Sequence, residues 1–384
     1  MFLRNKACVF SEKALKIELS PIERIMERVT SETINLAGGS PDPEVIPVQE
    51  IKHAFEEVVA EWGASAFFYP GAGGLEELRK QIRSYASYLG VAGGDVAVTS
   101  GAQHALTLLC ASLLSGEAFA HENPTFVEGM NPFLFYGGLS LPIRVDQNGL
   151  VVEELEARVK SNKPKLVYTV PLCHNPTGVN MSEQRRKKLV ELAEKFDFFV
   201  VEDDPYRPIS EKQPTPLYNF SQERVIYVGS LSKALAPGLR IGFIITKNQE
   251  LLQRVKALEQ MDFSTSTSNQ LLASRLLKKG VVTQRLQALR EHYKQKMRIL
   301  VESLKRHQIP LVFEPQGGFF ALIDAKKHAE QVAHEALKKG VAVVPAKPFY
   351  FDGTGQTHLR ISVGPVPKQK IDEGVWILSK VLKR

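Results

Sequence analysis

A lysine, two serines and an arginine share one short loop of this sequence, and together they could perform amine chemistry beside an anion. The loop holds Ser230, Ser232, Lys233 and Arg240, and an apolar run stands on either side of it. A lysine amine can act as a nucleophile, and hydroxyl and guanidinium groups are donors that bind phosphate or carboxylate. The alternative is an ordinary polar loop whose lysine is solvated, as most lysines are.

Three other polar motifs also follow strand-like apolar runs. They are Ser100-Gly101-Ala102-Gln103, Asn175-Pro176-Thr177-Gly178 and Asp203-Asp204-Pro205-Tyr206. Open α/β sheets bind ligands at the carboxyl ends of their strands, so we expect these motifs and the lysine loop at one edge of a sheet. The first two could be simple turns and Tyr206 a core aromatic, but two carboxylates at a buried strand end need a cationic or donor partner. The four motifs together predict a functional site.

Short apolar strands alternate with amphipathic helices through most of the chain and would position these motifs. Strands are predicted at 96–100, 117–121, 140–145, 165–171, 198–203, 225–230 and 240–246, and helices at 48–61, 75–89, 101–109, 125–136, 151–161, 182–196, 248–260 and 268–279. This alternation is typical of βαβ units, so we predict an α/β fold with a mostly parallel sheet covered by helices on both faces. The order of the strands stays open.

The pattern changes near residue 284, which predicts a second, smaller α+β domain. A long helix is predicted over 284–307, followed by strand-like runs at 311–313, 319–323, 341–344 and 358–362 and helices at 328–339 and 368–382. Near the other end of the chain, Ser20-Pro21 is typical of a helix N-cap followed by proline in the first turn. We expect three parts: an N-terminal segment, 1–45, that belongs to the small domain, a large domain, 46–280, and the small C-terminal α+β domain, 281–384.

The composition excludes several classes of protein. With 384 residues, 43% of them hydrophobic and 24% charged, the chain is typical of a globular protein of two domains. No apolar run approaches the roughly 18 residues of a membrane span, and no signal peptide is recognisable. The three cysteines, Cys8, Cys110 and Cys173, form no disulfide pattern. These features predict a cytoplasmic protein without a membrane partner.

The net charge of +7 raises the question of a nucleic-acid partner. The basic residues are spread along the chain, and the densest run, 185–188, opens a helix whose later positions are apolar, which favours a solvated helix face. The sequence holds no G-x-G-x-x-G, Walker, H-E-x-x-H or C-x-x-C motif. Ser230 to Lys233 matches the S-x-x-K of penicillin-recognising enzymes, but S-D-N and K-T-G do not occur. We expect neither a nucleic-acid partner nor a bound metal.

The ordered set of motifs resembles the class I/II pyridoxal-phosphate-dependent aminotransferases of fold type I over nearly the whole chain. The segments at 36–41, around Tyr69 and at 201–206 are similar to the branch of 2-aminoadipate and kynurenine aminotransferases and aminotransferase-like transcription regulators. Those regulators carry an N-terminal winged helix. The segment before Ser20 is too short for one, so we expect a free-standing enzyme.

The resemblance implies that the large domain binds pyridoxal 5'-phosphate. Lys233 would form an imine with the cofactor aldehyde and shuttle the proton between the substrate Cα and the cofactor. Asp203 would keep the pyridine nitrogen protonated, so that the ring acts as an electron sink. Tyr206 and Asn175 would hydrogen-bond the ring hydroxyl, and Phe126 would stack on the ring where the family usually has a tyrosine.

The resemblance also implies a site for the cofactor phosphate and a homodimer. The phosphate would be held by Ser230, Ser232, Arg240 and the backbone N–H groups of Ala102 and Gln103. Tyr69 matches a tyrosine that reaches the phosphate of the neighbouring subunit. We therefore expect a homodimer with shared active sites.

The substrate α-carboxylate would be bound by Arg360, with Gly39 and Asn175 close by. Glu23 stands where aminoadipate-type relatives have an arginine for acidic side chains, so we expect an acidic donor to be disfavoured. The implied reaction is ping-pong transfer of an amino group from an amino acid to a 2-oxo acid, with 2-oxoglutarate as the expected acceptor. The alternatives are a lyase or decarboxylase on the same scaffold, and a regulator-derived module that binds an effector without turnover.

Overall fold

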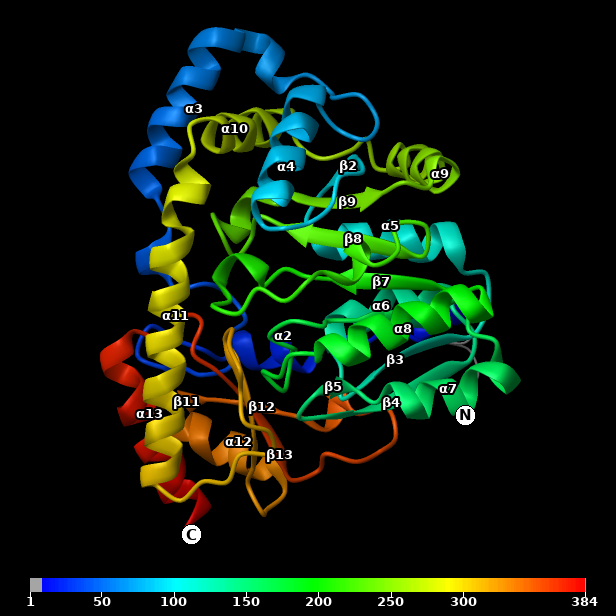
Figure 1. Ribbon diagram of the computed structural model, residues 1–384. Helices are drawn as coiled ribbons and strands as arrows, with labels where there is room; N and C mark the ends of the chain where they lie inside the picture. Colours follow the sequence, from blue (N-terminus) through cyan, green and yellow to red (C-terminus); the bar gives the residue numbers. More distant parts are fainter. Residues whose placement is uncertain (1–8, 384) are drawn as a thin grey trace.

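A sheet of eight strands forms the centre of the larger part of the computed structural model, which describes residues 9–383 (Figure 1). The strand order is β2-β9-β8-β7-β6-β3-β4-β5. The strands are β2 (Asp95–Thr99), β3 (Phe119–Asn123), β4 (Ser140–Asp146), β5 (Gly149–Leu150), β6 (Leu166–Thr169), β7 (Phe199–Asp203), β8 (Val225–Ser230) and β9 (Gly242–Thr246). The neighbours from β4 through β3, β6 and β7 to β8 pair in parallel, whereas β9, β2 and β5 pair antiparallel. The predicted mostly parallel α/β sheet is confirmed.

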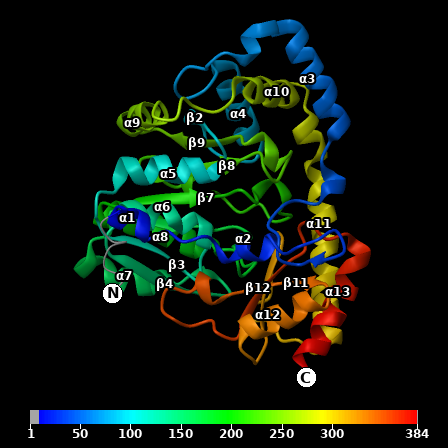
Figure 2. The same cartoon turned by 180° about the vertical axis from the view of Figure 1, so that it is seen from behind.

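Helices cover both faces of this sheet, which explains why the inner strands are almost entirely buried. They are α3 (Val48–Trp62), α4 (Glu76–Tyr88), α5 (Ala102–Leu113), α6 (Val127–Tyr136), α7 (Val152–Asn162), α8 (Glu183–Phe196), α9 (Gln249–Glu259) and α10 (Thr267–Lys278). α7 and α8 lie on the face seen in Figure 1, and α5 and α6 lie on the opposite face, seen in Figure 2. Every residue of β8 is buried, as expected of a strand covered on both sides.

The smaller part is an α+β unit with a three-stranded antiparallel sheet of order β10-β13-β12. Its elements are α11 (Val281–Arg306), β10 (Phe320–Asp324), α12 (Ala329–Lys338), β11 (Val341–Ala342), β12 (Val344–Pro345), β13 (His358–Ser362) and α13 (Lys368–Leu382). The strand-like run at 311–313 makes only an isolated bridge, between Leu311 and Ile323. Pro310 and Pro315 flank that run, and a proline cannot donate to a ladder.

The N-terminal segment crosses from the large sheet to the small unit. It contains the short helices α1 (Glu12–Leu15) and α2 (Pro21–Met26) and the strand β1 (Ile34–Asn35). The Ser20 hydroxyl accepts from the Ile22 N–H, so the predicted N-cap is present. β1 pairs in parallel with β11, which attaches this segment to the small unit. Cys8 and the other seven residues of 1–8 lie outside the described residues.

One helix, α11, belongs to both hydrophobic cores. Its apolar residues from Val282 to Tyr293 lie in the core of the large sheet, and those from Met297 to Leu304 lie in the core of the small unit. Between them the fully buried Lys296 donates from Nζ to Asp42 Oδ2 at 2.7 Å and to the Gly364 carbonyl at 2.8 Å. Because the two cores share this helix, the boundaries at 45 and 280 stay a prediction. Within residues 9–383 no helix is long and apolar enough to cross a membrane.

Candidate active site

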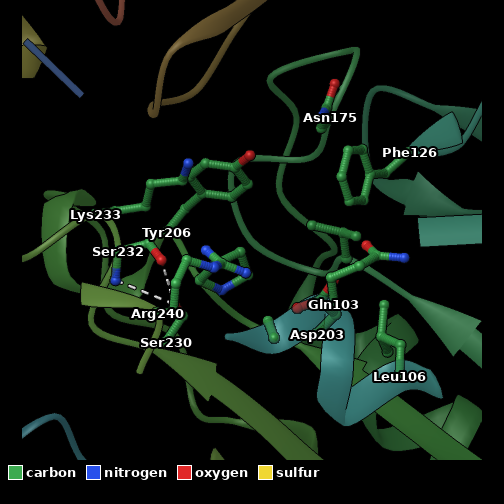
Figure 3. Close-up of a pocket in the computed structure, with 13 residues that line it drawn as sticks. Gln103, Leu106, Phe126, Asn175, Asp203, Tyr206, Ser230, Ser232, Lys233 and Arg240 are labelled. Atoms are coloured by element: carbon green, nitrogen blue, oxygen red, sulfur yellow. Dashed lines mark hydrogen bonds between the residues drawn. The ribbon is translucent and has the colours of Figure 1, made fainter. Parts of the chain in front are cut away.

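The four polar motifs meet at one edge of the large sheet. Asp203 ends β7 and Ser230 ends β8, Ala102 opens α5 directly after β2, and Asn175 lies in the loop after β6. Their side chains converge on a cavity with an empty volume of about 650 Å³ (Figure 3). The lining residues are Ala102, Gln103, Leu106, Phe126, Val170, Asn175, Asp203, Pro205, Tyr206, Ser230, Ser232, Lys233 and Arg240. All the predicted cofactor-binding residues except Tyr69 are among them.

The amine of Lys233 has a pKa below its ordinary value. Burial lowers its pKa to about 8, and the neighbouring positive charges of Arg240 and Arg360 add to this effect. Its Nζ donates to the Gly39 carbonyl at 2.8 Å, which fixes the amine beside the N-terminal segment. A lysine with such a pKa is partly neutral near pH 8 and can therefore act as a nucleophile or a base.

Asp203 presents one free carboxylate oxygen to the cavity. Its Oδ2 accepts from the Tyr168 hydroxyl at 2.9 Å, whereas the buried Oδ1 has no hydrogen-bond partner within residues 9–383. Burial raises the pKa of Asp203 to about 7, although the bond from Tyr168 opposes that rise. A buried carboxylate oxygen without a donor calls for a cationic N–H, because leaving it unpaired costs free energy. The nitrogen of a protonated pyridine ring would meet this need.

A second group of donors surrounds the start of α5. Ser230 Oγ donates to Ser232 Oγ at 2.9 Å and also accepts from the Ser232 N–H at 3.1 Å (dashed in Figure 3). Gly101 caps α5 with a φ of 82° and makes no side-chain cap, so no capping side chain occupies the first N–H groups of this helix. A Cβ on Gly101 would lie 2.3 Å from Arg240 Nη2, so the guanidinium packs directly on this backbone. Hydroxyls, a guanidinium and a helix N-terminus together suit a phosphate group.

Arg360 is buried next to this cavity without an anion. It is 1% exposed, and its guanidinium carbon Cζ lies 4.6 Å from the Phe320 ring centre and 5.2 Å from that of Phe349. Its two hydrogen bonds go to neutral acceptors, Ala37 O at 2.6 Å and Asn175 Oδ1 at 3.2 Å, and Nε has no partner in the described chain. Burial lowers the pKa of Arg360 to about 10. A buried cation of this kind is suited to a carboxylate ligand.

The remaining predicted residues divide between the cavity and the surface. Tyr206 is buried with its ring edge-on to Phe319 and Phe320, and burial raises its pKa. Tyr69 lies outside the cavity, 83% exposed, with its ring 5.3 Å from that of Phe263. Glu23 is also exposed, on α2.

Two polar residues near the cavity were not foreseen from the sequence. Tyr168 lies in the buried strand β6, and a hydroxyl in such a strand must find a partner, which could have drawn attention to it. Glu128 lies in the first turn of α6, two residues after Phe126, where an acidic residue is common simply because of the helix dipole. For this reason nothing in the pattern of residues singled it out. Among residues 9–383 no group of three metal-ligating side chains occurs.

The chain was compared with known proteins. The profile of the family "Aminotransferase class I and II" matches residues 31–377. Aromatic-amino-acid aminotransferase 1 of Thermococcus litoralis is 33% identical over 97% of this chain and 94% of its own length. The 2-aminoadipate transaminase of Thermus thermophilus is 32% identical over 97% and 96%.

A solved structure agrees with these sequence matches. Kynurenine aminotransferase of Pyrococcus horikoshii, determined in complex with PMP, superposes with a TM-score of 0.92 at 32% identity, over 100% of this chain and 99% of that one. Because both the family profile and relatives above 30% identity span nearly the whole sequence, this chain belongs to the class I and II aminotransferases, the pyridoxal-phosphate-dependent enzymes of fold type I.

Proposed function

We propose that this aminotransferase moves an amino group from an amino acid to a 2-oxo acid, with pyridoxal 5'-phosphate bound in the cavity at the edge of the large sheet. One observation carries the proposal: the amine of Lys233 and the carboxylate of Asp203, with its Oδ1 unbonded in the described chain, line one cavity, and the buried cation of Arg360 lies beside it, bonded to the lining residue Asn175. These are a base, a partner for a ring nitrogen and a partner for a carboxylate.

Each residue has a separate task in this proposal. When bound, pyridoxal 5'-phosphate supplies a ring that accepts the electron pair left by the substrate Cα–H bond. Lys233 would hold the cofactor through its amine, and Nζ would take the proton from the substrate Cα. Asp203 Oδ1 would accept from the ring N–H, and Tyr206 and Asn175 would hydrogen-bond the ring hydroxyl. Arg360 orients the substrate by its α-carboxylate.

The phosphate group would be held by the donors around the start of α5. Ser230, Ser232 and Arg240 supply side-chain donors, and Ala102 and Gln103 supply backbone N–H groups. Phe126 would stack on the ring and, because it has no hydroxyl, would make no hydrogen bond to it. Gly39 would border the substrate, because its carbonyl accepts from Lys233 Nζ at 2.8 Å.

We further propose ping-pong kinetics with 2-oxoglutarate as acceptor, and a homodimer in which Tyr69 reaches the partner's phosphate site. Support for the dimer comes from a set of large apolar side chains exposed near Tyr69: Phe67, Phe68, Met261 and Phe263. Such a patch on a protein surface marks an interaction site. Sedimentation velocity of the wild type and of Tyr69→Ser tests this. Location in the cytoplasm stays a prediction from the sequence.

The reaction is tested by mixing the purified holoenzyme with single amino acids while no acceptor is present. Loss of the visible absorbance with one equivalent of 2-oxo acid formed, followed by recovery of the band on adding 2-oxoglutarate, supports transamination in two halves. Release of ammonia or carbon dioxide instead would favour the lyase or decarboxylase. Binding without any change of the spectrum would favour the effector-binding module.

A further inference from the structure

A buried ion pair joins the long helix α11 to the N-terminal segment and has no task in the chemistry above. Lys296 and Asp42 are both buried, and Lys296 Nζ donates to Asp42 Oδ2 at 2.7 Å. Burial by itself raises the pKa of Asp42, but the bond from Lys296 and the other donors outweigh it, so this pKa lies below its ordinary value. Asp42 is therefore ionised, and removing Lys296 would leave its charge uncompensated in the interior.

The segment 36–42 supplies two backbone carbonyls to the functional groups of the site. Ala37 O accepts from Arg360 Nη2 at 2.6 Å, and Gly39 O accepts from Lys233 Nζ at 2.8 Å. A shift of this segment would move a partner of Arg360 and a partner of Lys233 at the same time. The segment contributes backbone atoms to both bonds, so its position decides what it offers to the site.

Two more residues of α11 hold Asp42. The Tyr293 hydroxyl accepts from the Asp42 N–H at 2.9 Å, and His292 Nε2 lies 3.0 Å from Asp42 Oδ2. Residues three and four apart lie on the same face of a helix, so His292 and Tyr293 share one face with Lys296. Because α11 packs into both cores, this face is a fixed support for the segment.

The ammonium of Lys296 also bonds to the chain beyond β13. Its Nζ donates to Gly364 O at 2.8 Å, and Gly364 lies two residues after β13, the strand that carries Arg360. A Cβ on Gly364 would lie 2.3 Å from Ser40 O, so the two segments pack backbone against backbone at this point. Lys296 therefore bridges the segment 36–42 and the chain that follows Arg360 where the two touch.

We propose that Lys296 is a positioning residue for substrate binding, which fixes the segment 36–42 relative to the strand that carries Arg360. This inference rests on the proposed function, in which Arg360 and Gly39 border the α-carboxylate of the amino acid. Lys296 is not among the residues that line the cavity, so it would act only through the two segments that it joins. Small displacements of groups that orient a substrate are costly, which makes such a support important.

Three variants of the holoenzyme test this role. Lys296→Met keeps a long unbranched side chain and removes the ammonium. Lys294→Met is the matched control, because Lys294 lies on the same helix but is half exposed and pairs with Glu211 at 2.6 Å. Leu155 is buried on α7 in the core of the large sheet, so Leu155→Ala should lower the melting temperature and leave the segment 36–42 in place.

Steady-state kinetics use the amino acid that gives the fastest half-reaction in the wild type. Lys296→Met should raise KM by about tenfold and change kcat by less than about threefold, because the bond between Arg360 and the substrate carboxylate is weakened. Cofactor affinity should stay within about twofold, since other segments hold the phosphate. Lys294→Met and Leu155→Ala should keep KM within about twofold of wild type. An unchanged KM in Lys296→Met, or an equal rise in Leu155→Ala, overturns the inference.

A double variant, Asp42→Asn/Lys296→Met, separates position from stability. It leaves no uncompensated carboxylate in the interior, so it should melt at a higher temperature than Lys296→Met. Its KM should still be raised by about tenfold, since the bridge to Gly364 is missing in both variants. Recovery of KM together with the melting temperature would mean that Lys296 acts through stability alone, and would overturn the positioning role.

Hydrogen exchange measured by mass spectrometry separates this inference from the proposed function, because it needs no turnover. Peptides that cover 36–42 should exchange about tenfold faster in Lys296→Met than in the wild type, and at the wild-type rate in Lys294→Met and Leu155→Ala. If no amino acid is transaminated, the proposed function fails, yet this difference must still appear. Equal exchange of these peptides in the wild type and Lys296→Met would refute the role of Lys296 whatever the reaction.

Discussion

Replacing Tyr168 by phenylalanine would remove the one side-chain donor that Asp203 has within residues 9–383 and leave the aromatic ring in place. The hydroxyl lies 2.9 Å from Oδ2, and both residues are buried. A hydrogen bond to a charged group contributes about 1.5–3 kcal/mol, which corresponds to one or two pKa units. Because burial already raises the pKa of Asp203 to about 7, Tyr168→Phe should move it to about 8–9 in the cofactor-free protein.

The sign of the pH effect on stability follows from this shift. The pKa of Asp203 in the folded protein lies above its ordinary value of 3.8, so its contribution to the free energy of unfolding is complete below pH 3.8 and is lost as the pH rises through 7. In Tyr168→Phe the loss continues to about pH 8–9. Urea unfolding of the cofactor-free proteins should therefore show a deficit of about 1.5–3 kcal/mol at pH 9 that shrinks toward pH 5.

The same change should be visible in turnover. In the proposed function Asp203 must be ionised to pair with the ring nitrogen, so the acid limb of the kcat profile should move up by about one to two pH units. Tyr227→Phe is the matched control, since Tyr227 is equally buried but its hydroxyl lies near Asp204 Oδ2, at 3.4 Å. If both variants keep the wild-type profile, or if the control shifts as far as Tyr168→Phe, Tyr168 does not set the charge of Asp203.

Three further substitutions test the rest of the site. Lys233→Ala should lower the half-reaction rate by about 10²–10⁴ and abolish borohydride-dependent attachment of the cofactor; a reducible adduct that persists at another residue would contradict this role. Arg360→Gln should raise KM for the amino acid by about 10- to 100-fold with a smaller effect on kcat, measured by steady-state kinetics, and an unchanged KM would show that the carboxylate binds elsewhere. Gly101→Ala places a Cβ 2.3 Å from Arg240 Nη2 at a φ of 82°. Equilibrium titration should therefore show cofactor affinity reduced by about tenfold or more. An unaltered affinity would mean that Arg240 can move aside without loss of phosphate binding.

Residues with unusual chemistry at strand ends were the most predictable part of this molecule. The lysine loop and the asparagine and aspartate motifs stand out because polar groups interrupt apolar runs, and the βαβ pattern implies that those interruptions share one edge. Local patterns also predicted helix boundaries to within a few residues, for example at α8, where Ser182 caps the helix that was expected from 182.

Relations between distant segments could not be obtained in this way. The order of the eight strands depends on pairings such as β2 with β9, which lie far apart in the sequence and leave no periodic signal. The same is true of the bond from Ser20 to Glu128 and that from Tyr168 to Asp203, because each donor and acceptor is an ordinary residue in its own element. Their significance arises only from proximity.

The shared helix α11 has a consequence for how the protein can be dissected. A fragment beginning at residue 281 would expose the apolar residues of α11 from Val282 to Tyr293 to water. A fragment ending at residue 280 would lack these residues, so the part of the large core that they cover would be exposed. The buried bond from Lys296 to Asp42 would be broken by either cut, since Asp42 belongs to the N-terminal segment. The two parts should therefore melt in a single calorimetric transition, and neither should survive as an autonomous folding unit.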